Sequence, residues 1–205
     1  MEIKVFQTGP IEVNTYIIFD KDTKDCAVFD IGGQVEYIAD FIKNNNLKLN
    51  AIYATHGHFD HIFGAKELQE KFDVPFYISE ADAVFAENLP AQLKMYGLNP
   101  ASPPKINGFL KENDEFYIGK QKVKILETPG HTIGGLCFLF DNILLSGDTL
   151  FLESVGRTDL PTGDFSALQK SVKEKLFKLD DTTKVLPGHG PSTSIGHEKA
   201  NNFYV

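Results

Sequence analysis

The sequence predicts a mixed α/β (α+β) fold in which two β-sheets pack together and carry helices on their outer faces. Short runs rich in Val, Ile, Tyr and Phe, which are typical of strands, recur in both halves of the chain. Amphipathic helical patterns lie between some of these runs. Many neighbouring runs are joined by short turns, which favours mixed or antiparallel sheets.

The first half of the chain supplies five strand-like runs and two helical patterns. The strand-like runs are residues 2–8, 14–20, 26–30, 49–55 and 74–79. Residues 34–46 are predicted to be helical because their apolar residues recur at helical spacing before a run of Asn: Val35, Ile38, Phe41 and Ile42. A second helical pattern at 61–72 is followed closely by Pro75. Helices are therefore interspersed with strands.

The second half repeats this style after a segment that we expect to be a loop, because it holds Pro90, Pro100, Pro103 and Pro104. Strand-like runs follow at 115–119, 122–130, 135–142, 143–151 and 183–190. Residues 164–179 read as an amphipathic helix, with Asp164 or Ser166 as its candidate N-cap. A chain of 205 residues with no low-complexity linker fits a single domain spanning 1–205.

Composition narrows the classes of function. The net charge is -8 and no window gathers Lys and Arg, so nucleic-acid binding is not expected. The two cysteines lie in apolar runs, as buried reduced thiols do. No N-terminal signal pattern and no long apolar stretch is present, so we expect a cytoplasmic protein without a membrane partner. Oligomeric state cannot be predicted from these features.

The segment ATHGHFDHIFG, residues 54–64, concentrates half of the 6 histidines of the chain. In an extended strand end His56, His58 and Asp60 can share one face. A turn into the following helix then carries His61 to a neighbouring position. Imidazole and carboxylate groups suit Zn²⁺, Fe²⁺ or Mn²⁺, and no cysteine is near enough for a thiolate-rich structural site. The cluster predicts a catalytic metal site more readily than exposed loop histidines with Asp60 as a helix cap.

Three more candidate ligands occur where strand-like runs end in Gly-containing turns. They are His131 in PGHT, Asp148 in SGDTLF and His189 in PGHG. Taken singly, each also fits an ordinary turn residue, and Asp148 fits an Asx-turn. Together with the first cluster they make seven ligands, which suits two divalent ions that share one carboxylate and a bridging water.

The motifs THGHFDH, PGHT, SGDTLF and PGHG occur in the order and approximate spacing of the metallo-β-lactamase superfamily, which the chain resembles over nearly its whole length. The resemblance implies a four-layer αββα sandwich with the metals at one edge of the packed sheets. It also implies two ligand sets and one bridging residue: His56, His58 and His131; Asp60, His61 and His189; and Asp148 as the bridge. Asp30 in VFDIGG matches an acidic residue that supports the site in the superfamily, and it fits a strand-end turn equally well.

Within the superfamily, THGHFDH together with LFLESVGRTDLPTGD is most similar to the short glyoxalase II-like (hydroxyacylglutathione hydrolase-like) hydrolases, which cleave thioesters such as S-lactoylglutathione. The resemblance implies a small-molecule thioester substrate and attack by a hydroxide that bridges two divalent ions, with zinc favoured and iron or manganese as alternatives. Asp60 could orient that hydroxide or accept its proton. Arg157 could bind a substrate carboxylate, or it could pair with Asp159 or Asp164 to hold a loop.

Two other functions stay open at the level of sequence. Persulfide dioxygenase, a related family that also contains GRTD, uses a single non-haem iron held by two histidines and an aspartate. The matching residues here are His56, His131 and Asp148. A non-catalytic metal-binding module on the same fold is the second alternative. His197 is predicted to be an exposed residue of a terminal helix without a metal role.

Overall fold

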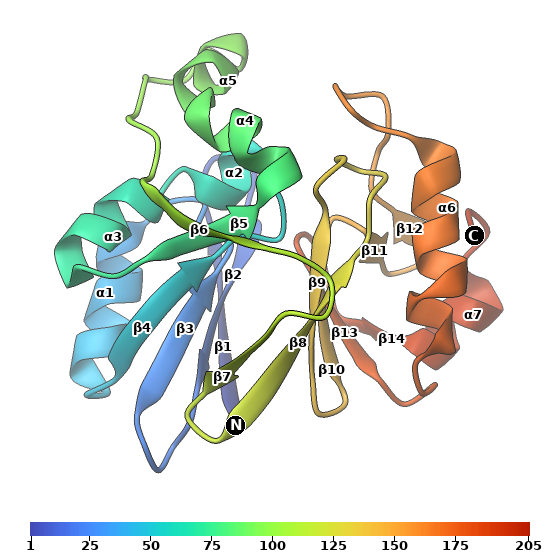
Figure 1. Ribbon diagram of the computed structural model, residues 1–205, viewed down its shortest axis with the longest axis horizontal. Coiled ribbons are helices and arrows are strands. Elements are labelled where there is room, and N and C mark those ends of the chain that lie inside the picture. The colour runs from blue at the N-terminus through green and yellow to red at the C-terminus, as the bar shows by residue number, and fades with distance from the viewer.

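The computed structural model describes residues 1–205 and contains two six-stranded sheets that face each other (Figure 1). The first sheet has the order β1 (Glu2–Thr8), β2 (Val13–Phe19), β3 (Asp25–Phe29), β4 (Lys48–Tyr53), β5 (Phe76–Ser79) and β6 (Ile106–Leu110). The second has the order β14 (Thr193–Ser194), β13 (Lys184–Pro187), β10 (Ile143–Gly147), β9 (Leu136–Phe140), β8 (Gln121–Glu127) and β7 (Glu115–Ile118). A short separate pair is formed by β11 (Leu150–Phe151) and β12 (Ser154–Val155).

Both sheets are mixed, as the short turns predict. Strands β1 to β3 pair antiparallel, and β3 to β6 pair parallel. In the second sheet only β10 and β13 are parallel. Parallel neighbours need crossover connections, which explains why α1 (Val35–Asn44) lies between β3 and β4, and α3 (Ala65–Phe72) between β4 and β5.

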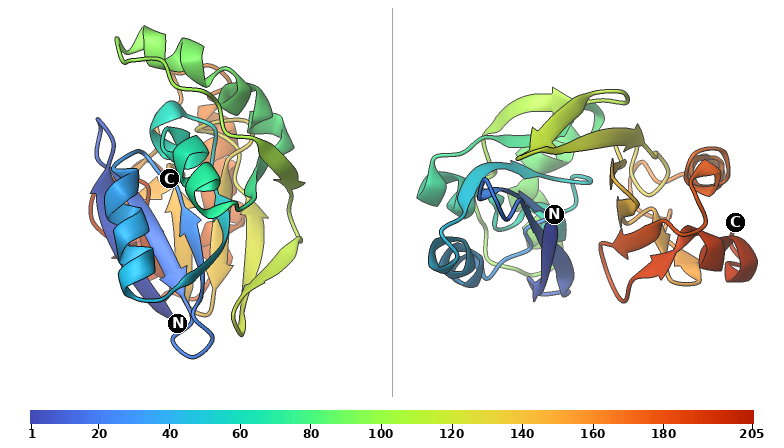
Figure 2. Two further views of the ribbon diagram at one scale, coloured as in Figure 1. Left: turned by 90° about the vertical axis from the view of Figure 1, so that its left-hand side faces the viewer. Right: turned by 90° about the horizontal axis from the view of Figure 1, so that it is seen from below.

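The remaining helices complete the outer layers and one edge. They are α2 (Phe59–Ile62), α4 (Ala83–Glu87), α5 (Leu89–Met95), α6 (Phe165–Glu174) and α7 (Ile195–Asn201), with short 3₁₀ turns at Glu80–Asp82 and Leu176–Lys178. Seen from below, α1 lies outside the first sheet, and α6 and α7 lie outside the second (Figure 2). No helix has the length and apolar character that crossing a membrane requires.

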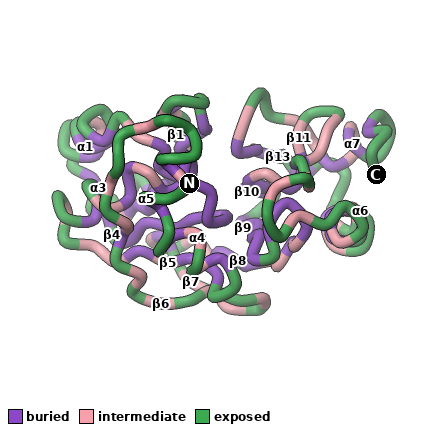
Figure 3. The backbone as a smooth tube through the Cα atoms, turned by 90° about the horizontal axis from the view of Figure 1, so that it is seen from above, coloured by how far each residue is buried: buried purple, intermediate pink, exposed green.

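Three hydrophobic clusters separate the four layers. Strand β2 is buried on both faces, so its alternate side chains enter different clusters. Ile17 packs with the helices α1 and α3, whereas Tyr16 and Ile18 pack against the second sheet. A third cluster lies between the second sheet and α6 and α7. Buried residues accordingly concentrate in the middle of the molecule, and exposed residues lie on the outer surfaces of the helices and on the edge strands β1 and β6 (Figure 3). The predicted four-layer αββα sandwich is confirmed.

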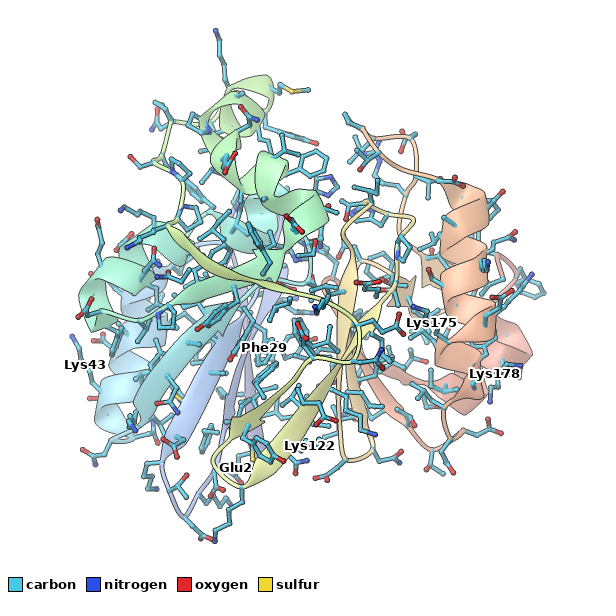
Figure 4. The ribbon with its side chains drawn as sticks, viewed as in Figure 1. Glu2, Phe29, Lys43, Lys122, Lys175 and Lys178 are labelled. Carbon is cyan, nitrogen blue, oxygen red and sulfur yellow. The ribbon has the colours of Figure 1, made fainter.

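Aromatic rings fill the space between the sheets. The ring of Phe29 stacks on Tyr53 at 5.2 Å and meets the edge of Phe138, from the other sheet, at 5.0 Å. Tyr53 also stacks on Phe116 at 4.2 Å. Figure 4 shows Phe29 in this central layer, while Lys43 and Lys178 lie at the periphery. These aromatic contacts join the two sheets.

One local expectation was wrong. The segment around Pro90 is not a loop, because α4 and α5 occupy most of residues 83–95. Pro90 lies in the first turn of α5, where the missing N–H has no helical partner to lose. The N-cap of α6 is Asp164, one of the two predicted candidates, and its carboxylate accepts a hydrogen bond from the backbone N–H of Ala167 at 3.0 Å.

Candidate metal centre

The seven predicted ligands meet at one edge of the two sheets. They come from five places: His56 and His58 follow β4, Asp60 and His61 belong to α2, His131 lies between β8 and β9, Asp148 follows β10, and His189 follows β13. The carboxyl ends of parallel strands meet at the same edge, and β10 and β13 are parallel neighbours. The loop that carries Asp148, directly after β10, therefore lies beside the loop that carries His189, directly after β13.

Three groups of ligand atoms are close enough to surround ions. Within each group the ligand atoms lie within 4.8 Å of one another: His56, His58 and His131; His56, His61 and Asp148; and Asp60, His61 and His189. The first and third groups coincide with the two ligand sets that the superfamily resemblance implies. The second group joins them through Asp148, so the arrangement suits two neighbouring ions.

Close contacts between nitrogen and oxygen atoms define the cluster. His58 Nδ1 lies 2.9 Å from His131 Nε2. His189 Nε2 lies 3.1 Å from Asp60 Oδ2. His61 Nε2 lies 3.3 Å from the same Asp60 oxygen and 3.4 Å from Asp148 Oδ1. So many potential ligand atoms that face one another and are largely shielded from solvent are expected where a cation binds between them.

Unsatisfied buried atoms provide the test of fit for metal ions. The five buried side-chain N or O atoms without a hydrogen-bond partner all belong to this cluster: His56 Nε2, His58 Nε2, both ring nitrogens of His61, and Asp148 Oδ1. Buried polar atoms are normally paired, and leaving each one unpaired costs about 1–3 kcal/mol. Imidazole nitrogens and carboxylate oxygens are ligands of Zn²⁺, Fe²⁺ and Mn²⁺, so the residues fit a dinuclear metal site.

Hydrogen-bond partners outside the cluster orient two of the imidazoles. His131 Nδ1 contacts the backbone oxygen of Arg157 at 2.7 Å, and His56 Nδ1 contacts the hydroxyl of Thr55 at 3.1 Å. Partners of this kind fix which nitrogen of each ring faces the site. His61 Nδ1 lies 3.0 Å from Asp30 Oδ2 without the geometry of a hydrogen bond, so this contact is electrostatic.

Asp30 supports the site rather than merely ending a strand. Its carboxylate accepts hydrogen bonds from the backbone N–H and the hydroxyl of Thr55, both at 2.8 Å, and also faces His61. Its φ of 53° is unusual for a residue other than glycine. Of the two alternatives that the sequence left open, the structure thus places Asp30 against a candidate ligand.

Burial and charge set the protonation of the ligands. Burial lowers the pKa of His56 well below the ordinary histidine value, and burial together with His131 lowers the pKa of His58 to about 4. These rings are therefore neutral, the form that binds metals. Burial raises the pKa of Asp60, but His61 and His189 outweigh it and hold this carboxyl well below its usual range.

A glycine makes room for the close approach of the loops. A side chain at Gly188 would place its Cβ 2.2 Å from Asp148 Oδ1 and 2.7 Å from His61 Cε1. Only a residue without Cβ fits there. The PGHG motif therefore contributes its backbone shape as well as His189.

A pocket of about 590 Å³ opens over the cluster, and its walls include five of the candidate ligands: His58, Asp60, His131, Asp148 and His189. Arg157 lines the same pocket. Its guanidinium donates two hydrogen bonds to the carboxylate of Asp159, both at 2.6 Å, so the predicted alternative of pairing with Asp159 is the contact present. His197 lies elsewhere, on α7, where it contacts Glu153 at 2.9 Å.

Asp82 is a site residue that sequence reasoning missed. Its side chain is fully buried and accepts hydrogen bonds from the N–H of Gly57 (2.9 Å), the N–H of Gly134 (2.8 Å) and the hydroxyl of Thr132 (2.7 Å). Gly57 lies between two candidate ligands, and Thr132 follows another. The only available signal was Ser79 three residues earlier, whose hydroxyl accepts from the N–H of Asp82 at 3.2 Å. That pattern is common in turns and carries no information about metals.

A cluster of His and Asp that fits two metal ions lies under a pocket, at the edge of two sheets flanked by helices, and this arrangement defines a candidate centre for metal-dependent chemistry. A model of the metallo-β-lactamase superfamily matches residues 8–189. The chain belongs to this superfamily.

Sequence relatives and solved crystal structures support this assignment. The hydroxyacylglutathione hydrolase GloC of Haemophilus influenzae is 36% identical over 214 residues, which cover 100% of this chain and 98% of that protein. The crystal structure of the BLEG-1 B3 metallo-β-lactamase is 33% identical with a TM-score of 0.92, and the alignment covers 99% of each chain. The crystal structure of TTHA1623 in a di-iron-bound form is 32% identical with a TM-score of 0.90, covering 98% of this chain and 100% of the other.

Proposed function

We propose that this protein is a metal-dependent hydrolase that cleaves thioesters, a class that includes S-lactoylglutathione. The observation that carries the proposal is the set of unsatisfied buried atoms of His56, His58, His61 and Asp148 beneath an open pocket. The similarity to GloC, which is named a hydroxyacylglutathione hydrolase, supports thioesters as the substrate class.

We assign the ligand sets as the superfamily resemblance implies, with zinc as the favoured metal and iron or manganese as alternatives. His56, His58 and His131 would hold one ion, and Asp60, His61 and His189 would hold the second. Asp148 faces ligands of both sets, since it lies 3.4 Å from His61 Nε2 and 3.5 Å from His131 Nε2. This position supports its role as the bridge.

Bound divalent ions supply a lowered pKa for coordinated water and polarisation of the thioester carbonyl. The side chains supply position and proton acceptance. Asp60 lies at the pocket floor with its Oδ2 shared between His61 and His189, so it can orient the attacking water and accept its proton. In the overall reaction the water oxygen bonds to the acyl carbon, the C–S bond breaks, and the thiolate takes up a proton. A thiol of pKa near 8.5 leaves readily, so no strong general acid is required.

A single-iron dioxygenase is the rival enzyme. Its three ligands would be His56, His131 and Asp148. In that case Asp60, His61 and His189 would have no role as metal ligands. Those three side chains nevertheless form a group of their own with ligand atoms within 4.8 Å. The presence of this third group supports two ions, and a similar protein, TTHA1623, has been crystallised in a di-iron-bound form.

Metal analysis combined with two assays tests the proposal. The purified protein is loaded with zinc, iron or manganese, and the ions bound per chain are counted. Thiol release is then measured on a panel of thioesters, and O₂ consumption is measured with glutathione persulfide. Two ions per chain with thiol release is the expected result. One iron with O₂ uptake would transfer the assignment to the dioxygenase, and neither activity in the loaded protein would leave a non-catalytic metal-binding module.

A further inference from the structure

The pocket above the metal centre has apolar walls outside the ligands. The apolar lining residues are Ile11 from the loop between β1 and β2, Phe59 from α2, Tyr96 at the end of α5, Phe151 from β11, Val155 from β12, and Leu160 from the segment between β12 and α6. The ring of Tyr96 packs against Phe59 in a tilted arrangement, with the ring centroids 4.5 Å apart. Ile11 and Tyr96 are about half exposed, at 49% and 52%, so they present apolar surface to an entering molecule.

The pocket offers no free cation from the protein chain. Arg157 is the one Lys or Arg among the lining residues. Asp159 binds the Nε–Nη2 edge of the guanidinium with two contacts of 2.6 Å. The ion pair has a net charge near zero, so it gives little attraction to a distant anion. A carboxylate of the substrate would compete with Asp159 for the charge of Arg157.

The polar group best placed to bind a peptide is also occupied. Gln92 lines the pocket from α5. Its amide N–H groups donate to the backbone oxygens of Gly57 (3.0 Å) and Phe85 (2.8 Å). Its side-chain oxygen accepts from the N–H of Phe59 at 3.0 Å. Gln92 therefore holds the ligand loop to α4 and α5 and has no donor left for a substrate amide.

We infer that the preferred substrate is a thioester of an uncharged thiol with an apolar acyl chain, and not a thioester of an anionic carrier such as glutathione. This inference rests on the proposed thioester hydrolysis and adds the identity of the carrier. Glutathione has two carboxylates and coenzyme A carries phosphates, and such charged groups are bound with specificity by cations that are not already paired. A cavity of about 590 Å³ with apolar walls suits a small, largely apolar molecule.

The first test compares matched substrates on the zinc-loaded protein. S-lactoyl-N-acetylcysteamine and S-lactoylglutathione share the acyl group and differ in the thiol. We expect kcat/KM to be about tenfold higher for the N-acetylcysteamine ester, and to rise up to about fourfold for each methylene added along the acetyl, butyryl and hexanoyl series. A glutathione ester that is cleaved as well or better would overturn the inference and leave the proposed function intact. If no thioester in the panel is cleaved, the proposed function itself fails.

The second test releases the arginine. In Asp159→Asn the guanidinium loses its charged partner, so the ratio of kcat/KM for S-lactoylglutathione to that for the uncharged ester should rise severalfold, and the gain should shrink in high salt. The matched control is Glu174→Gln on α6, which removes an exposed carboxylate that lies 3.9 Å from Lys170 and outside the pocket lining. An unchanged ratio in Asp159→Asn would contradict the role of the ion pair in excluding anionic carriers.

Discussion

Replacing Asp82 with alanine should loosen the metal centre without removing any candidate ligand. The buried carboxylate accepts three hydrogen bonds, from Gly57, Thr132 and Gly134. Alanine leaves two buried N–H groups and one hydroxyl without a partner, at about 1–3 kcal/mol each. These losses are not additive, and water can enter the cavity, so we expect about 3 kcal/mol in the free energy of unfolding. For a chain of this length that corresponds to a Tm lower by roughly 6–12 °C.

The metal affinity should fall as well, because Asp82 joins the loop of His56 and His58 to the loop of His131. We expect the Kd for zinc, measured by competition with a chromophoric chelator, to weaken about 10- to 100-fold. Asp82→Asn keeps one acceptor oxygen and should show roughly half of each effect. It also keeps the test usable if the alanine variant does not fold.

The control for this experiment is Asp22→Asn, which removes an exposed carboxylate paired with Lys120 at 3.2 Å, far from the site. Its Tm should change little, since exposed ion pairs contribute less than about 1 kcal/mol. An Asp82→Ala protein that melts at the wild-type temperature and binds zinc with an unchanged Kd would refute the proposed link between the loops.

Four other outcomes are expected. Asp148→Ala should lose bound metal and turnover while its circular dichroism stays that of a folded protein, and full activity would contradict the bridging role. Gly188→Ala should lower zinc affinity, measured by the same chelator competition, because its Cβ would lie 2.2 Å from Asp148 Oδ1; wild-type affinity would show that the loop can move aside. Phe138→Ala should destabilise the fold by about 3–5 kcal/mol in denaturant unfolding, because it empties the layer between the sheets; a loss under 1 kcal/mol would mean that the layer repacks. Removing metal with a chelator should lower the Tm and restoring zinc should raise it again, whereas identical melting curves would exclude binding by the folded state.

The ligand cluster could be predicted because each ligand lies at the end of a recognisable strand. His56 and His58 follow an apolar run, and four chemically suitable residues within six positions are hard to explain otherwise. Singly, His131, Asp148 and His189 were compatible with ordinary turns. Their convergence depends on strand order, and pattern alone does not give that order because β10 pairs with β13 across an intervening helix.

The contacts that support the ligands could not be predicted, because they join residues far apart in sequence that carry no motif. Asp82 and Gln92 occur in a stretch whose prolines suggested a loop. Pro90 misled because a proline in the first turn of a helix and a proline in a loop look alike without the neighbouring structure. For Arg157 the sequence offered a substrate or an acidic neighbour, and only coordinates could show the fork closed on Asp159.

Hydrogen bonds between protein groups join the two halves of the molecule at the edge that carries the candidate metal ligands. Asp82 of the first half holds the loop of the second that carries His131. The side chain of Asn14 on β2, also in the first half, donates to the backbone oxygens of Pro187 (3.0 Å) and Gly190 (2.9 Å), on either side of His189. Tyr16 donates to the same Pro187 oxygen at 2.7 Å. Because these bonds do not involve the ligand atoms, they can hold the loops in position while nitrogen and oxygen atoms of the cluster stay unpaired. The packed sheets and these hydrogen bonds offset the cost of leaving those nitrogen and oxygen atoms unpaired. The ligands are therefore already oriented when an ion binds, and the free energy of ion binding adds to the stability of the junction between the halves.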